Sequence, residues 1–260
     1  FTNASSTQTI SKYSAAATYG PETFAYLIST KTGGLLQLFS DVNIVGTGSG
    51  ALTLRGAANL DLAGKAINMN GGGSIKVETA ARNIVGAAGS QININAVTSV
   101  ESVSGGLLSV GTNVVTTLNN AIDFGNSVTT LSGKLVVKTN GKATSAPIYS
   151  GTSAVLEFNG TGTSTTPYIV NKEWSGTIAG STNYTFAPGL GIPYSVNLIN
   201  STVQQYAAEV SANTLTIDAS SKLIQDPTTN YYDLKLFGNL TNNGTIVGNN
   251  RTVIFQGNAA

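Results

Sequence analysis

The sequence predicts an all-β protein, a right-handed parallel β-solenoid (β-helix) with an irregular insertion. Three observations lead to this fold class: short clusters of alternating apolar and polar residues, a regular spacing between clusters, and separators of Gly, Asn, Ser and Ala. Alternation places apolar side chains on one face of a strand, and the separators favour tight bends. The alternative fold is a series of β-sandwich repeats.

The clusters between Leu52 and Leu135 set the length of a coil. They begin about every 7.5 residues, so three clusters make a coil of about 22 to 23 residues. Sandwich strands usually recur at a looser spacing of about 8 to 12 residues. Asn-Gly and Asp-Gly, the strongest signals for two-residue hairpins, are also sparse in this chain. Both observations favour the solenoid.

The pattern divides the chain into four segments. Residues 1–34 are predicted to form an N-terminal cap or junction strand, because the end of a solenoid needs a cover. Regular coils follow over residues 35–159. Residues 160–212 lose the rhythm and hold three of the six prolines, which predicts an irregular insertion rich in aromatic residues. Alternation then resumes, so residues 213–260 are predicted to form C-terminal coils and a junction to the next repeat.

The composition excludes several classes of function. Charged residues are 10% of the chain, and 13 basic against 12 acidic residues with no dense run of either sign give no footprint for nucleic acid. The absence of Cys and His removes thiolate chemistry, Ser-His-Asp hydrolysis and histidine-bound metals. No apolar stretch approaches the roughly 20 residues of a membrane-spanning helix. We therefore expect no enzyme activity, no cofactor, and no membrane insertion in this segment.

Two segments near the C-terminus resemble a known class of repeats. GNLTNNGTI begins at Gly238, and RTVIFQGNAA begins at Arg251. Together they resemble repeats of very large cell-surface proteins of Bacteroidetes, and the Gln8–Ile10 stretch (QTI) looks like the next element of such a repeat. The chain also ends near Phe255 much as it opens at Phe1, which suggests tandem copies.

The resemblance implies a secreted, extracellular protein at the cell surface, exported by the type IX route. The function expected from it is a structural repeat unit of a bacterial surface fibre or adhesin that supports adhesion, biofilm formation or surface motility. Its partners would be neighbouring copies of the same repeat or subunit. A glycan-binding module that recognises surface glycans is the alternative, and a polysaccharide lyase or hydrolase with clustered carboxylates is a weaker one.

Two sets of residues are candidates for a site. Aromatic rings stack on the apolar face of a pyranose, so four residues are candidates for a glycan platform: Trp174, Tyr184, Tyr231 and Tyr232. The alternative is that these residues form the local core of the insertion. Three acids follow one another at the predicted coil spacing: Glu78, Glu101 and Asp123. Stacked in one column, they could bind Ca²⁺ as a ladder, whereas small shifts in register would scatter them over a solvated face.

Overall fold

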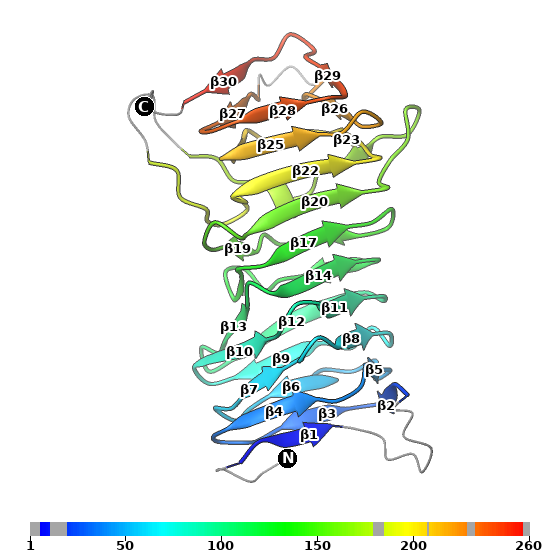
Figure 1. The fold of residues 1–260 in the computed structure, drawn as a ribbon, viewed down its shortest axis with the longest axis vertical. Helices are drawn as coiled ribbons and strands as arrows, with labels where there is room; N and C mark the ends of the chain where they lie inside the picture. The colour runs from blue at the N-terminus through cyan, green and yellow to red at the C-terminus, as the bar shows by residue number, and fades with distance from the viewer. Residues whose placement is uncertain (1–5, 11–19, 179–184, 207, 228–231, 257–260) are drawn as a thin grey trace.

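The chain forms a β-solenoid of about nine turns, which confirms the predicted fold class (Figure 1). This computed structural model describes residues 6–10, 20–178, 185–206, 208–227 and 232–256. Strands in the front sheet of Figure 1 run from left to right while the chain climbs from its N-terminus, so the winding is right-handed. All named strands pair in parallel, and two isolated antiparallel bridges lie outside them, at Ile148–Leu190 and Gly189–Ile192.

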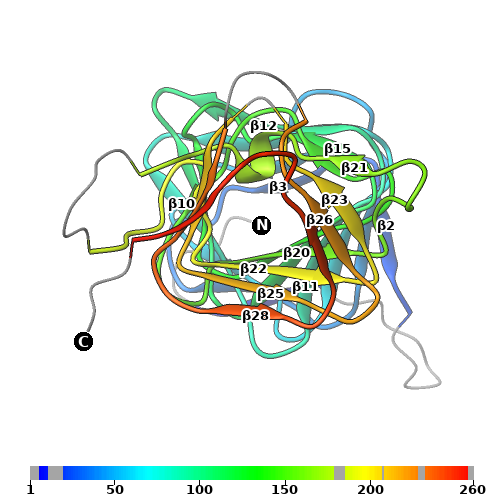
Figure 2. The same cartoon turned by 90° about the horizontal axis from the view of Figure 1, so that it is seen from above.

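The strands lie on three faces, here named A, B and C (Figure 2), and each turn contributes one strand to each face, except that the turn of β20 and β21 contributes none to face A. Face B is one continuous sheet of ten strands. Its strands are β2 (Glu22–Phe24), β5 (Val42–Ile44), β8 (Ala66–Met69), β11 (Ser90–Ile94), β14 (Val114–Leu118), β17 (Lys134–Val137), β20 (Val155–Asn159), β22 (Ser195–Ile199), β25 (Thr214–Ile217) and β28 (Leu240–Asn242).

Faces A and C are each divided into two sheets. Face A has seven strands and then three: β1 (Gln8–Ile10), β4 (Leu35–Leu38), β7 (Asn59–Asp61), β10 (Ala81–Val85), β13 (Leu107–Val110), β16 (Thr129–Leu131) and β19 (Ile148–Tyr149), followed by β24 (Val210–Ala212), β27 (Leu234–Leu236) and β30 (Val253–Phe255). Face C has six strands and then four: β3 (Leu27–Ser29), β6 (Leu52–Leu54), β9 (Ile75–Glu78), β12 (Thr98–Val103), β15 (Ala121–Asp123) and β18 (Lys142–Ala143), followed by β21 (Tyr168–Ile169), β23 (Thr202–Gln204), β26 (Lys222–Ile224) and β29 (Thr245–Val247).

Apolar residues stack in columns inside the three faces. On face B, Val42 pairs with Ile67, and Ile67 pairs with Ile92 in the next turn. All three side chains are buried. Burying a side chain of this size contributes about 1.5 to 3 kcal/mol, so the columns form one continuous core along the axis.

Coil length varies from turn to turn. Asn68 and its partner Asn93 are separated by 25 positions in the sequence, whereas Ser195 and its partner Thr214 are separated by 19. The predicted length of about 22 to 23 residues lies between these values. Corner loops absorb the difference, because paired strands must keep their register on every face.

Asparagine side chains form ladders on the outside of the solenoid. Each amide donates from Nδ2 to the Oδ1 atom of the preceding turn at 2.7 to 2.9 Å. One ladder joins Asn43, Asn68 and Asn93, and its neighbour joins Asn70, Asn95 and Asn119. The Asn-rich composition therefore adds side-chain hydrogen bonds parallel to those of the backbone.

The structure differs from the predicted segments in two places. Strands β1, β2 and β3 each pair within one of the three faces, so the described part of the predicted cap contributes strands to the solenoid. Residues 195–212 are also regular, because Leu156 of β20 pairs directly with Val196 of β22. The irregular stretch is therefore shorter than predicted, because the strand pattern of β22 was hidden among neighbouring prolines and aromatic residues.

The break in faces A and C lies beside this irregular stretch. A single-turn 3-10 helix, η1 (Lys172–Trp174), stands there next to the end of β18. No helix in the part of the chain that the structure describes is long and apolar enough to cross a membrane.

Candidate functional site

The three acids predicted to form a column lie on face C, in successive strands β9, β12 and β15. Their register is staggered, because Glu101 pairs with Lys76 and Asp123 pairs with Ser99. Glu101 is therefore two positions away from the column of Glu78, and Asp123 is two positions away from the column of Glu101. The predicted single column is wrong, because the coils that join these pairs are longer than the expected length of about 22 to 23 residues.

The acids also have partners other than a metal. Glu78 accepts from Arg55 Nε at 2.5 Å and forms an ion pair with Lys76 at 3.4 Å. The Arg55 hydrogen bond lowers the pKa of Glu78. Asp123 accepts a hydrogen bond from the hydroxyl of Ser145. Within the described ranges, no three His, Cys, Asp or Glu side chains come together to hold a metal ion, so these acids do not form the predicted Ca²⁺ ladder.

The predicted aromatic platform is also not formed by Trp174. Its side chain is 1% exposed, and its indole Nε1 donates to the carbonyl of Ser211 at 3.0 Å. The ring fills the interior where face A is interrupted, so it cannot present a face to a sugar. Tyr232 is half-buried, while Tyr184 and Tyr231 lie outside the described residues.

Glu173, next to this tryptophan, is a fully buried carboxyl group at the break in face C. Its Oε2 accepts from the backbone N–H of Ala143 at 3.1 Å. Its Oε1 accepts from the N–H of Asn171 at 2.8 Å and from the hydroxyl of Tyr168 at 2.9 Å. In a regular turn, the N–H of Ala143 would donate to a backbone carbonyl of the next strand. Here it donates to the carboxyl group of Glu173, which takes the place of that carbonyl.

Burial sets the ionisation of this cluster. It raises the pKa of Glu173, and the hydrogen bonds from Asn171, Ala143 and Tyr168 oppose that rise only in part. Burial, followed by the nearby Glu173, raises the pKa of Tyr168. Tyr168 therefore stays a neutral phenol whose hydroxyl is held in one direction.

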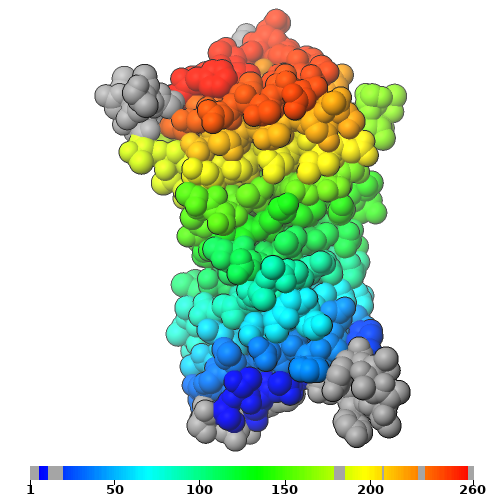
Figure 3. Space-filling view, in the orientation of Figure 1, coloured from blue at the N-terminus to red at the C-terminus, as the bar shows by residue number. Residues whose placement is uncertain are grey.

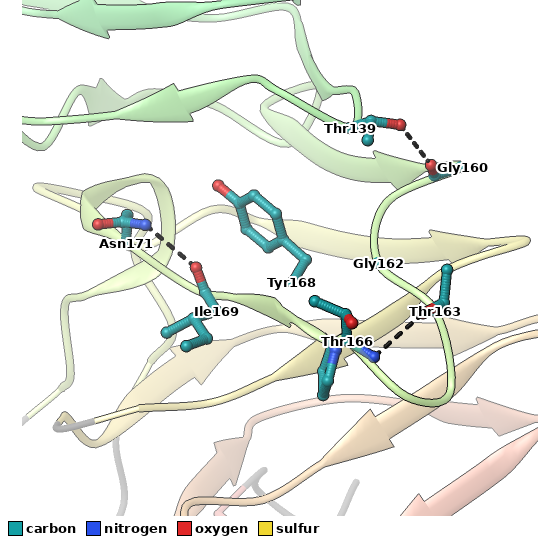
Figure 4. Close-up of a pocket in the computed structure, with 9 residues that line it drawn as sticks. Thr139, Gly160, Gly162, Thr163, Thr166, Tyr168, Ile169 and Asn171 are labelled. Atoms are coloured by element: carbon teal, nitrogen blue, oxygen red, sulfur yellow. Dashed lines mark hydrogen bonds between the residues drawn. The ribbon is translucent and has the colours of Figure 1, made fainter.

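A groove of about 510 Å³ opens beside Tyr168, on the outside of the break (Figure 4). Figure 4 shows the Tyr168 ring between Thr139 and Gly160 on one side and Ile169 and Asn171 on the other. The residues that line it are Thr139, Gly160, Gly162, Thr163, Thr166, Pro167, Tyr168, Ile169 and Asn171. None of them carries a carboxylate, an ammonium or a guanidinium group.

Two glycines shape the loop at the base of the groove. Gly160 and Gly162 have φ values of +68° and +66°, in the left-handed region that favours glycine. A Cβ on Gly162 would also clash with the carbonyl oxygen of Thr202. The loop closes on itself, because Thr163 N–H donates to the carbonyl of Thr166 at 2.8 Å and Thr166 N–H donates to Thr163 Oγ1 at 3.0 Å.

The Tyr168 ring is fixed before any ligand arrives. It packs against Phe158 with ring centroids 5.5 Å apart, and its hydroxyl is bound to Glu173. Such a site can bind and orient a ligand, but its lining offers no carboxylate for acid–base chemistry. The sequence analysis did not select Tyr168, although Gly-x-Gly at residues 160–162, shortly before Pro167 and Tyr168, was a signal of close backbone approach.

The last described turn is less buried than the turn before it. Its inward residues are only partly buried, whereas their partners in the preceding turn are 0% or 1% exposed. The three pairs are Leu215 with Leu240, Leu223 with Ile246, and Leu234 with Val253. Each face therefore has one inward apolar side chain in this turn that no further turn covers within the described residues.

The fold defines the class of this protein as a parallel β-solenoid. No family model, curated protein or solved structure matches the chain.

Proposed function

We propose that this chain is a structural repeat unit of an extracellular bacterial surface fibre or adhesin, supporting adhesion, biofilm formation or surface motility. The observation that carries the proposal is the stack of parallel turns, whose last described turn holds inward residues that are less buried than those of the turn before it. Strands β28, β29 and β30 each stand at the end of their sheet, and β1, β2 and β3 stand at the opposite ends. The first and last described turns therefore both have strands on faces A, B and C, with the same chain direction.

Head-to-tail stacking of copies follows from this symmetry of the two ends. The β1–β3 edges of one copy would continue the β28–β30 edges of another, and such a contact does not close on itself, so it builds a filament. Completing the burial of Leu240, Ile246 and Val253 would contribute about 2 to 4 kcal/mol, since each is already partly buried. Backbone hydrogen bonds on three faces would fix the orientation and register of one copy relative to the next.

The shape of the molecule suits a shaft. Successive turns form bands stacked along the long axis (Figure 3). With parallel strands about 4.8 Å apart, nine turns give a rod of about 43 Å per copy. The secreted location and the surface role rest on the resemblance of the C-terminal segment to Bacteroidetes surface repeats, and the stacking geometry supports the fibre independently.

Electron microscopy and sedimentation velocity of the purified chain over a range of concentrations test the proposal. We expect rows of particles joined end to end and a sedimentation coefficient that rises with concentration. Ile246→Asp, which places a charge on the inside of the last described turn, should abolish the association. Thr241→Asp is the matched control, because Thr241 is exposed on the outside of β28. Short, separate particles at every concentration would contradict end-to-end stacking.

A further inference from the structure

We infer that the groove beside Tyr168 is a binding site for a neutral saccharide, with the apolar C–H face of a pyranose against the Tyr168 ring. This inference goes beyond the structural role proposed above and does not depend on it. The site does not use the predicted aromatic residue Trp174, which is inside the core. It uses an aromatic side chain that is held in the wall of a groove (Figure 4).

The wall of the groove combines an aromatic ring with hydroxyl and amide groups. Sugar-binding sites combine an aromatic surface with polar groups that form hydrogen bonds in defined directions. Here hydroxyl groups of Thr139, Thr163 and Thr166 and the amide of Asn171 surround the Tyr168 ring. Asn171 donates one N–H to the Ile169 carbonyl at 3.1 Å, and its Oδ1 can accept a hydrogen bond from a ligand.

The nine residues that line the groove carry no formal charge. A uronate or a sugar phosphate is usually held by Arg or Lys, and none of the nine lining residues is cationic. Tyr168 cannot supply a negative charge, since burial and Glu173 raise the pKa of its hydroxyl. The groove therefore favours a ligand that carries hydroxyls and no ionised group.

Contacts with neighbouring residues hold the Tyr168 ring and the loop before it in place. The Tyr168 hydroxyl donates to Glu173, and Phe158 packs against its ring. The loop before it is tied to the neighbouring turn, because Gly160 N–H donates to the Ile199 carbonyl at 3.0 Å. A ligand would lose little free energy in ordering these groups. The groove volume of about 510 Å³ also lies within the range of about 300 to 1,000 Å³ that is typical of small-molecule sites.

The direct test is saturation-transfer NMR and titration calorimetry with cellobiose, maltose and chitobiose, using digalacturonate as the charged comparator. We expect at least one neutral disaccharide to bind, and digalacturonate to bind at least about tenfold more weakly. Tyr168→Ala should lower affinity by about tenfold or more, whereas Tyr168→Phe keeps the ring and should stay within about threefold. Tyr26→Ala is the matched control, because Tyr26 is 52% exposed in the first turn.

A second variant keeps the inference testable if Tyr168→Ala does not fold. Asn171→Ala retains the backbone N–H that Glu173 accepts, and it should weaken binding by about threefold or more. The inference is overturned if no neutral disaccharide binds the wild-type chain at about 10 mM. It is also overturned if digalacturonate binds best, or if Asn171→Ala and the folded Tyr168 variants bind as the wild type does.

Discussion

Replacing Glu173 by Ala should destabilise the protein strongly. The change removes the acceptor of three hydrogen bonds, from Ala143 N–H, Asn171 N–H and the Tyr168 hydroxyl, at a fully buried position. Each buried donor left without a partner costs about 1 to 3 kcal/mol. Relief from holding a buried carboxyl group offsets part of this cost, so we expect a loss near the lower end, about 3 to 5 kcal/mol in total.

The glutamine variant separates hydrogen bonding from side-chain volume. In Glu173→Gln, the amide oxygen can still accept from Asn171 and Tyr168, but the amide NH₂ then faces the N–H of Ala143. We expect a smaller loss, of about 1 to 2 kcal/mol.

Urea denaturation followed by circular dichroism measures these free energies of unfolding. Glu101→Ala is the control, since its carboxylate accepts from Ser49 in a solvent-exposed contact, and it should stay within about 0.5 kcal/mol of the wild type. A loss below about 1 kcal/mol for Glu173→Ala would refute the reasoning, as would a glutamine variant that is less stable than the alanine variant.

Three further predictions concern pH, the asparagine ladder and the loop glycines. Because burial raises the pKa of Glu173 above its ordinary value of 4.5, the folded chain keeps a proton that the unfolded chain releases. Stability should therefore fall as pH rises from about 4.5 to the raised pKa and then level off; denaturation across pH should show this term in the wild type but not in Glu173→Gln. Asn68→Ala removes two ladder hydrogen bonds and should cost about 1 kcal/mol in thermal melts, whereas the exposed Thr216→Ala should cost almost nothing, and equal melts would contradict the ladder's contribution. Gly162→Ala should lower the melting temperature more than Gly160→Ala, since both have positive φ but only Gly162 meets a backbone carbonyl; the reverse order would show that the loop adapts.

The fold could be predicted because its signals are local. A stretch such as Ile92-Asn93-Ile94 carries the two-residue period within the strand itself, and Gly and Asn mark the corners. Coil length was less predictable, since it depends on how many residues each corner accommodates. A small error in the length of one turn was enough to place Glu101 beside Lys76 and not in the column of Glu78.

The candidate site could not be predicted, because its parts meet only after a long excursion of the chain. Leu156 pairs with Val196, and the residues between these two partners supply most of the groove. The carboxyl group of Glu173 is buried where it accepts a hydrogen bond from the N–H of Ala143, which lies far earlier in the sequence. Trp174 was predicted to stack on a sugar because its ring is aromatic, but its indole N–H donates to a carbonyl inside the core.

The continuity of face B, alongside the two divided faces, has a mechanical consequence. Ladder hydrogen bonds run along the axis, so tension between the ends stretches them lengthwise and lets coils peel off singly. A coil of 19 to 25 residues would release roughly 65 to 90 Å of extended chain. Under load, the rod should part first between β17 and β20, where face B is the one sheet that continues across the break, giving two halves that yield as separate steps in a force-extension trace.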